Sequence, residues 1–241
     1  MYDLSEFSLS DMTLCGRELR RLGYGARSME EIAQRIVRYF RENFRAGTTA
    51  DPECALVRFF LTVPYRELEP ELQRFAQTLV GGERIAPEMR CLTLLATAGE
   101  EPAWNSRQSS AGHRALPLLS EESIARSPMI AQLMGQFGIE LATLLEPDPA
   151  VIVDEEQHSY NVFHIPEAAG SPFIPAQREF VQKFGIRSVL GFGGLLPSAE
   201  LFAVILFSRR GIPRQTADLF KTLALNVKVA LLPLLGGRRF A

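Results

Sequence analysis

The loop that follows residue 99 holds several side chains of the kinds that bind small molecules. Trp104 offers an aromatic surface, Asn105 and Arg107 offer amide and guanidinium donors, and His113 offers a ring that titrates near neutral pH. The segment 100–120 is polar and rich in turn residues, and loops of this length often face a ligand. We therefore predict that these residues contact a ligand. The alternative is a surface loop whose Trp covers the core.

A second group of polar rings lies in the segment HSYNVFHIP, residues 158–166. On an extended chain His158, Tyr160 and His164 share one face, because side chains alternate along a strand, and Asp154 falls on the same face. Such a face could hold a metal or haem, but hydrogen-bonded histidines near a sheet edge are the interpretation we favour. We add these three residues and Phe192 to the predicted ligand contacts, and the identity of any cofactor stays unknown.

The glycine-rich stretch GFGG, residues 191–194, raises the question of a phosphate-binding loop. A dinucleotide fingerprint needs GxGxxG between a strand and a helix, whereas here a turn at Pro197 leads into the apolar run LFAVILF. Neither a third correctly spaced glycine nor GxxxxGK[ST] is present. We therefore interpret GFGG as a bend in a hairpin strand, where glycine permits a bulge or a close approach of backbone.

Several classes of catalytic site are absent from the sequence. There is no GxSxG elbow, no HExxH and no CxxC pair. The three cysteines, Cys15, Cys54 and Cys91, are far apart and odd in number, which argues against a disulfide framework and favours buried thiols. We expect that the chain is not an enzyme, with a redox enzyme dependent on Cys54 and Cys91 as the less favoured alternative.

Composition limits the partners and the location. The chain has 241 residues, a net charge of -2 and a pI near 6.0, so there is no global basic field and we expect no nucleic-acid partner. No apolar run approaches the ~20 residues of a membrane span, and the first residues lack a signal-peptide pattern. We therefore expect a cytoplasmic protein that does not bind a membrane.

Hydrophobic periodicity predicts an α/β chain. Helical spacing covers 9–22, and a second helix starts at Ser28, where Glu31 completes a capping-box pattern, and runs through Phe44. The remaining predictions are strands at 54–63, 90–99, 185–194 and 201–208, helices at 67–82, 130–137, 174–185 and 212–231, and two or three short extended segments between 139 and 166.

The order of these elements at the C-terminal end resembles that of a GAF domain. The residues that carry the resemblance are GIRSVLGFGG (185–194), LFAVILFS (201–208) and the closing helix IPRQTADLFKTLALNVKVAL (212–231). The resemblance implies an antiparallel sheet of about six strands with helices on one face, terminal helices that pack together, and a small-molecule or chromophore sensor. The long segments before residue 54 and between 100 and 140 depart from the family pattern.

The terminal helices could also join a partner. The C-terminal helix is apolar around much of its circumference, which favours burial on two sides and hence a homodimer. We predict a helical arm at 1–50 and a GAF-like domain at 51–241, forming one structural unit that senses a small ligand and signals to a partner protein; a ligand-free interaction module is the alternative. The predicted dimer-interface residues are Leu19, Leu22, Leu223, Val227 and Leu231.

Overall fold

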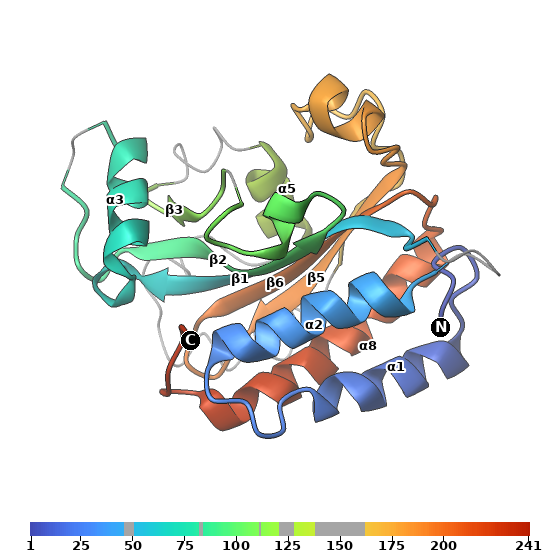
Figure 1. Cartoon of the computed structure of the whole chain (residues 1–241), viewed down its shortest axis with the longest axis horizontal. Helices are drawn as coiled ribbons and strands as arrows, with labels where there is room; N and C mark the ends of the chain where they lie inside the picture. Colours follow the sequence, from blue (N-terminus) through green and yellow to red (C-terminus); the bar gives the residue numbers. More distant parts are fainter. Residues whose placement is uncertain (46–50, 82–83, 111, 121–127, 138–161) are drawn as a thin grey trace.

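The fold is a six-stranded antiparallel sheet with helices packed on it (Figure 1). The computed structural model describes residues 1–45, 51–81, 84–110, 112–120, 128–137 and 162–241. The strand order is β3-β2-β1-β6-β5-β4. The strands are β1 (Cys54–Pro64), β2 (Arg90–Gly99), β3 (Ala115–Pro117), β4 (Val162–Ile165), β5 (Ser188–Leu195) and β6 (Leu201–Ser208).

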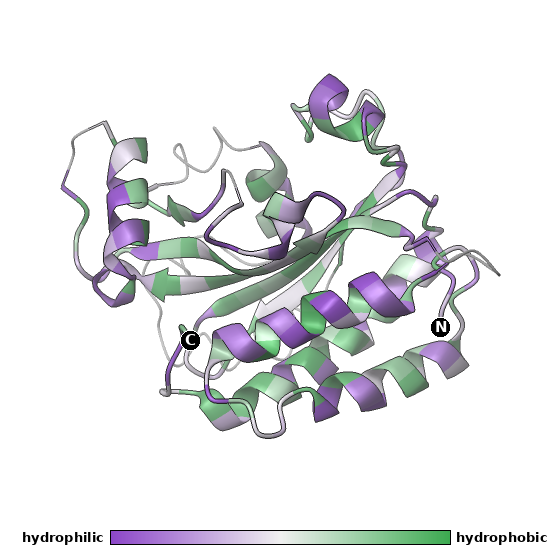
Figure 2. Ribbon diagram, in the orientation of Figure 1, coloured by the Kyte–Doolittle hydropathy of each residue, from purple (hydrophilic) through white to green (hydrophobic). Residues whose placement is uncertain are grey.

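The longer helices gather on one side of the sheet. α2 (Met29–Asn43) lies against β1 and β2, α8 (Arg214–Leu231) lies against β4 and β5, and α1 (Leu9–Arg21) packs on α8. In Figure 2 the apolar sides of these helices point toward the sheet and toward each other, which is the amphipathic pattern that their sequences predict. We call the sheet surface that they cover the helix face.

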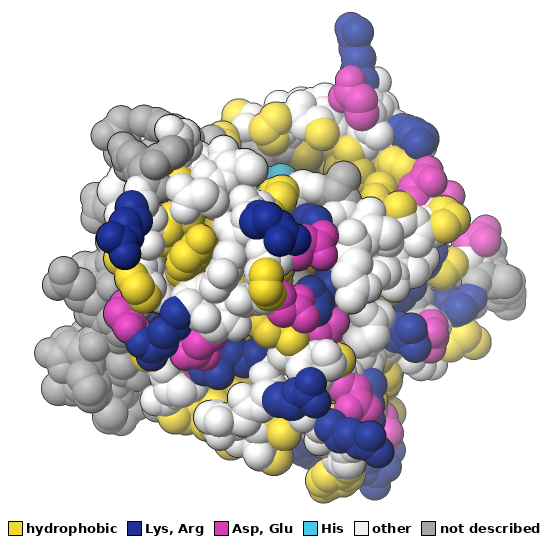
Figure 3. Space-filling model, turned by 60° about the vertical axis from the view of Figure 1, so that its left-hand side comes forward, with side chains coloured by type: hydrophobic (Ala, Val, Ile, Leu, Met, Phe, Trp, Pro, Cys, Tyr) yellow, Lys and Arg dark blue, Asp and Glu magenta, His cyan; other side chains and the backbone are white. Residues whose placement is uncertain are grey.

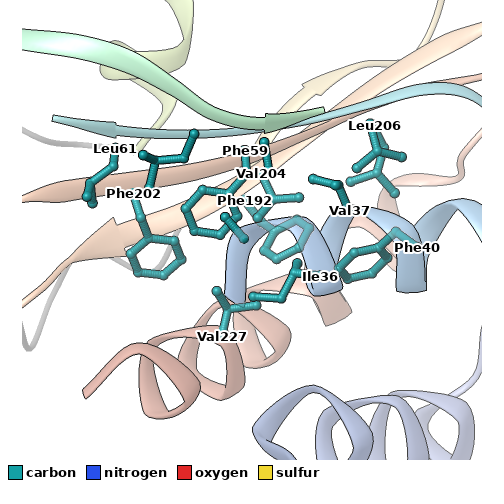
Figure 4. Close-up of a cluster of buried hydrophobic side chains, with 14 of the residues drawn as sticks. Ile36, Val37, Phe40, Phe59, Leu61, Phe192, Phe202, Val204, Leu206 and Val227 are labelled. Carbon is teal, nitrogen blue, oxygen red and sulfur yellow. The ribbon is translucent and has the colours of Figure 1, made fainter. Parts of the chain in front are cut away.

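The helix face holds a dense apolar core. Alternate residues of β1, β5 and β6 point into it, and α2 and α8 supply the opposing side chains. Phe40, Phe192 and Phe220 meet there with ring centroids 5.3–6.2 Å apart. Figure 4 shows Phe40, Phe192 and Val227 among the labelled side chains of this cluster. The N-terminal helices therefore share one core with the rest of the domain.

The opposite surface, which we call the cavity face, is covered by shorter pieces. These are the 3₁₀ turn η2 (Pro102–Asn105), α5 (Pro128–Phe137) and the π-helix η3 (Gln177–Gln182), while α3 (Pro70–Leu79) packs beside the edge strand β3. The 3₁₀ turns η1 (Tyr65–Glu67) and η4 (Leu232–Leu234) follow β1 and α8. A second cluster of buried apolar residues lies on this side of the sheet.

The structure confirms the six-stranded antiparallel sheet and the packed terminal helices that we predicted, and two segments differ locally. Residues 174–185 contain a π-helix in place of the expected short α-helix, and β3 forms in a stretch that we had interpreted as loop. The GFGG stretch shows no bulge, because β5 pairs with β6 without a register shift from Ser188 to Leu195. Close approach explains Gly193: a Cβ there would lie 2.0 Å from the Phe202 carbonyl oxygen.

Among the described residues, no helix is both long and apolar enough to cross a bilayer.

Candidate functional site

A cavity of about 550 Å³ opens on the cavity face, between the sheet, α5 and η3. This volume falls within the range of small-molecule sites. Its walls are mostly apolar. The described residues that line it are Leu56, Arg58, Trp104, Gly112, His113, Pro128, Met129, Ile130, Phe173, Ile174, Pro175, Ala176, Glu179, Phe180 and Phe207.

Arg58 places a positive charge on the floor of this cavity. It lies in the middle of β1, between Leu56 and Phe60, which also point to the cavity face. The guanidinium Nη2 donates to Ser110 Oγ at 3.1 Å, whereas Nε is buried without a hydrogen-bond partner among the described residues. Burial lowers the pKa of Arg58 to about 10, so the side chain is charged at neutral pH.

His113 stands at the mouth of the same cavity. Gly112 and His113 have φ values of 71° and 49°, and the left-handed conformation is uncommon for a residue with a Cβ. Much of the His113 side chain is exposed, yet displacement of solvent by the surrounding protein and the Arg58 charge both lower the pKa of its imidazole. We therefore expect a neutral ring at physiological pH, able to donate one hydrogen bond and to accept another.

An aromatic cluster forms the side wall. Trp104 lies 4.6 Å from Phe184 and 5.7 Å from Phe180 between ring centroids, and Phe180 contacts Phe207 of β6 in an edge-on arrangement. Gly99 makes room for the indole, since a Cβ at Gly99 would lie 2.7 Å from an atom of the Trp104 ring. Trp104 and His113 thus line one cavity, as a shared ligand site requires.

Asn105 and Arg107 belong to the same loop but point elsewhere. The amide of Asn105 binds both the N–H and the carbonyl of Gly99, each at 3.1 Å, so it secures the end of β2. Arg107 is 6% exposed and holds Glu30 through two hydrogen bonds of 2.6 and 2.9 Å and Glu69 through one of 2.8 Å. Neither side chain lines the cavity.

His164 and Phe192 lie on the helix face, across the sheet from the cavity. The ring nitrogen Nε2 of His164 donates to the carbonyl of Ile212 at 3.0 Å, and burial lowers the pKa of its imidazole. Phe192 is fully buried against Phe40 and Phe220. The prediction that Trp104 and His164 line one pocket is therefore wrong, because the two side chains lie on opposite faces of the sheet. His158 and Tyr160 lie outside the described residues.

The predicted dimer-interface residues pack inside one chain. Leu19, Leu223, Val227 and Leu231 are fully buried, and Leu22 is partly buried, in the core that α1 and α8 form together. The exposed apolar residues of α8 and the turn after it are Leu225, Val229 and Leu232 instead. A homodimer stays a prediction, and these three residues are the ones that a partner could reach.

Nothing in the described part of the chain points to metal or thiol chemistry. No group of three or more His, Cys, Asp or Glu side chains there is placed to hold a metal ion. Cys15, Cys54 and Cys91 are buried, and burial raises the pKa of each thiol to about 12, whereas a reactive cysteine needs a lowered pKa.

Sequence reasoning missed Arg58, although a signal for it was present. The run CALVRFFLTV contains a single charged residue at its centre, and a lone charge within an apolar strand must either pair with an opposite charge or face a polar site. By contrast, the strands β4, β5 and β6 are buried on both sides, so their sequences do not reveal which face of each strand covers the cavity.

No family model and no curated protein matches this sequence. Among solved structures, it is similar to the chromophore-binding domain of a Stigmatella aurantiaca bacteriophytochrome mutant in the Pr state, with a TM-score of 0.40 and 11% identity. It is also similar to the wild-type photosensory core module of Stigmatella aurantiaca phytochrome, with a TM-score of 0.41 and 12% identity. The matches cover 93% and 95% of this chain but only 60% and 37% of those chains, and at such low scores we take nothing about ligand or activity from them.

Proposed function

We propose that this chain is a GAF-like regulatory module that binds a small ligand in the cavity beneath Trp104 and passes the state of the cavity to its terminal segments. The observation that carries the proposal is the cavity itself: about 550 Å³, mostly apolar, and provided with one arginine and one histidine. A preformed apolar site with a few convergent polar groups is the usual form of a small-molecule site.

The loop between β2 and β3 supplies a physical link from the cavity to the chain ends. Trp104 and His113 of this loop line the cavity, while Arg107 of the same loop binds Glu30 at the start of α2. Arg107 also lies 5.1 Å from the ring centre of Phe240, near the C-terminus. A ligand that shifts the loop would therefore act on α2 and on the C-terminal tail through the same side chain.

The C-terminal tail is fastened to the domain at several other points. The carbonyls of Arg238 and Arg239 accept the N–H groups of Met29 and Glu30, which caps the start of α2. Arg239 forms ion pairs with Glu67, at 2.9 Å, and with Glu200. Release or retention of residues 236–241 is thus a change that the loop could control.

The first test is native mass spectrometry of the purified chain, followed by thermal-shift screening with small metabolites. We expect an adduct or a stabilising compound whose effect is lost in Trp104→Ala and kept in Tyr24→Ala, since Tyr24 is 77% exposed and far from the cavity lining. A protein without adduct that no compound stabilises, or stabilisation that survives Trp104→Ala, would overturn the cavity as the sensory site.

A second candidate function is a homodimeric interaction module. The observation in its favour is that Leu225, Val229 and Leu232 recur at intervals of four and three residues, the spacing of a helix-pairing seam, and are 47%, 41% and 38% exposed. Light scattering after gel filtration tests it: Val229→Glu should convert a dimer to a monomer, while Leu79→Glu on α3 should not. A wild-type monomer at high concentration excludes this candidate.

A further inference from the structure

We propose that the ligand of this cavity is a small carboxylic acid with an apolar or aromatic body, whose carboxylate binds Arg58. The inference rests on the proposed function, because it names the ligand class for the same cavity. Its support comes from the state of Arg58 and its neighbours on the floor of the cavity.

Arg58 has a hydrogen bond to Ser110 but no ion-pair partner in the described part of the chain. Its guanidinium forms no ion pair with any described carboxylate, and burial is the cause that lowers its pKa. Arg107 provides the contrast within the same domain, since two glutamates bind it. An arginine that is partly removed from water commonly pairs with an acid, so one without an ion pair that faces a cavity indicates that the acid arrives with the ligand.

Two hydroxyl groups, those of Thr97 and Ser110, lie beside Arg58, and both are buried behind the described lining of the cavity. Thr97 of β2 is the cross-strand neighbour of Arg58, so both side chains point to the cavity face. The Thr97 Oγ1 is buried without a hydrogen-bond partner among the described residues, as is Arg58 Nε. Ser110 already accepts from Arg58 Nη2. An incoming carboxylate would give the guanidinium of Arg58 the acid partner that it lacks among the described residues.

The charge balance favours a carboxylate over a phosphate. Arg58 supplies one positive charge, Glu179 in the described lining is an exposed carboxylate, and the lowered pKa of His113 leaves its ring neutral, so the lining offers a ligand at most one positive charge. A phosphate monoester would bring nearly two charges into a site of apolar walls, with one left uncompensated. The planar fork of arginine also matches the two oxygens of a carboxylate.

The walls define the body of the ligand. Leu56 and Phe207 line the cavity from the sheet, Ile130 lines it from α5, and Trp104 and Phe180 offer aromatic surfaces. Glu179 is the acidic residue among the described lining, and it is exposed. A ligand that carries its charge at one end and a hydrocarbon or aromatic group at the other fits this division.

The test is isothermal titration with octanoate, benzoate and indoleacetate, each beside its primary amide, and with phenyl phosphate. The proteins are the wild type, Arg58→Met, which keeps an apolar stem, and Arg178→Met, which removes an exposed arginine of η3 that does not line the cavity. We expect at least one acid to bind the wild type about tenfold more tightly than its amide, because a hydrogen bond to a charged group is stronger than one to a neutral group. The preference should vanish in Arg58→Met and persist in Arg178→Met.

The outcomes separate the ligand class from the proposed function. Amides that bind as well as their acids, tighter binding of phenyl phosphate, or an acid preference that survives Arg58→Met would overturn the carboxylate and leave the cavity as a ligand site. The metabolite screen could instead find a neutral ligand whose binding is lost in Trp104→Ala, while none of the acids binds. The proposed carboxylic-acid class would then be wrong, but the cavity would remain the ligand site. If neither experiment finds a ligand, both proposals fail together.

Discussion

The two faces of the sheet differ in what covers them. On the helix face, long helices bring continuous apolar stripes onto the strands, and residues such as Phe40, Phe192 and Phe220 are fully buried. The cavity face is covered by short turns, the π-helix η3 and the ten-residue helix α5, which leave a cavity between them. The charged Arg58 lies on the floor of that cavity. The comparison indicates that the helix face holds the denser core, whereas the other face holds the cavity that we propose as the ligand site.

The surface charges that Figure 3 shows are mixed in sign. On the side of the molecule shown in Figure 3, basic and acidic side chains alternate between apolar ones, and no single-sign field covers that view. Recognition by a broad electrostatic field is therefore a poor description of that surface, whereas a single charge among apolar walls is screened less than a charge on the open surface.

The largest expected change in the free energy of unfolding compares one residue from each face. Phe192→Ala removes a fully buried ring from the helix face and should lower the free energy of unfolding by about 3–5 kcal/mol. Phe173→Ala removes a half-buried ring that lines the cavity and should cost only about 1 kcal/mol. Urea unfolding of both variants checks the comparison, and equal losses would show that the two faces contribute alike.

Arg107 joins the faces, and its loss should be the next largest effect. Arg107→Met leaves Glu30 and Glu69 without their cation, and breaking a pair this buried costs about 3 kcal/mol. Carboxypeptidase should also remove residues near Phe240 faster, because the ring loses its guanidinium neighbour.

A matched exposed pair provides the control for Arg107. Arg17 pairs with Glu18 at the surface, so Arg17→Met should change the free energy of unfolding by less than about 1 kcal/mol and leave the tail as resistant as before. A tail that stays protected in Arg107→Met would break the proposed link between the loop and the C-terminus.

Arg58 should show the opposite sign. Because the ligand-free protein holds this charge in an apolar cavity, Arg58→Met should raise the free energy of unfolding by about 1–2 kcal/mol. Thermal and urea unfolding of the ligand-free variant measure the change. A stabilised variant that no longer prefers acids would identify Arg58 as a residue kept for binding, whereas a destabilised one would assign it a structural role.

The same contrast explains which features the sequence could predict. The boundaries of α1, α2 and α8 follow from apolar residues at helical spacing, and the strands β1, β2, β5 and β6 follow from β-branched and aromatic runs. The cavity face was harder. β3 has only three residues, and its pairing with β2 comes from the sheet rather than from its own propensity.

The sequence of a strand that is buried on both sides does not show which residues point to which face of the sheet. His164 and Phe192 were predicted beside Trp104, but residue parity along β4 and β5 puts them on the helix face. The π-helix was also beyond prediction, because the bonds from Val181 N–H to the Ala176 carbonyl and from Ile186 N–H to the Val181 carbonyl span five residues and leave no signature in residue type.

The smallest expected effect compares one histidine from each face. The pKa values of His164 and His113 are both lowered in the folded chain, so as the pH falls through about 6.5 the unfolded state binds protons that the folded state does not, and stability decreases. The buried His164 ring contributes at most about 1.4 kcal/mol per pH unit, and the exposed His113 contributes less because solvent screens it. His164→Gln and His113→Gln should each flatten the decrease measured by urea unfolding between about pH 7.5 and about pH 5.5.

A bound acid should separate the two rings. A carboxylate on Arg58 would place a negative charge near His113 and raise the pKa of that imidazole, while His164 is shielded on the other side of the sheet. Saturating octanoate should therefore weaken the pH dependence in His164→Gln, where His113 alone remains, and leave it unchanged in His113→Gln. An equal response of both variants would mean that the acid acts on the whole domain rather than from the cavity. The proposed difference between the two faces would then be wrong for ligand binding.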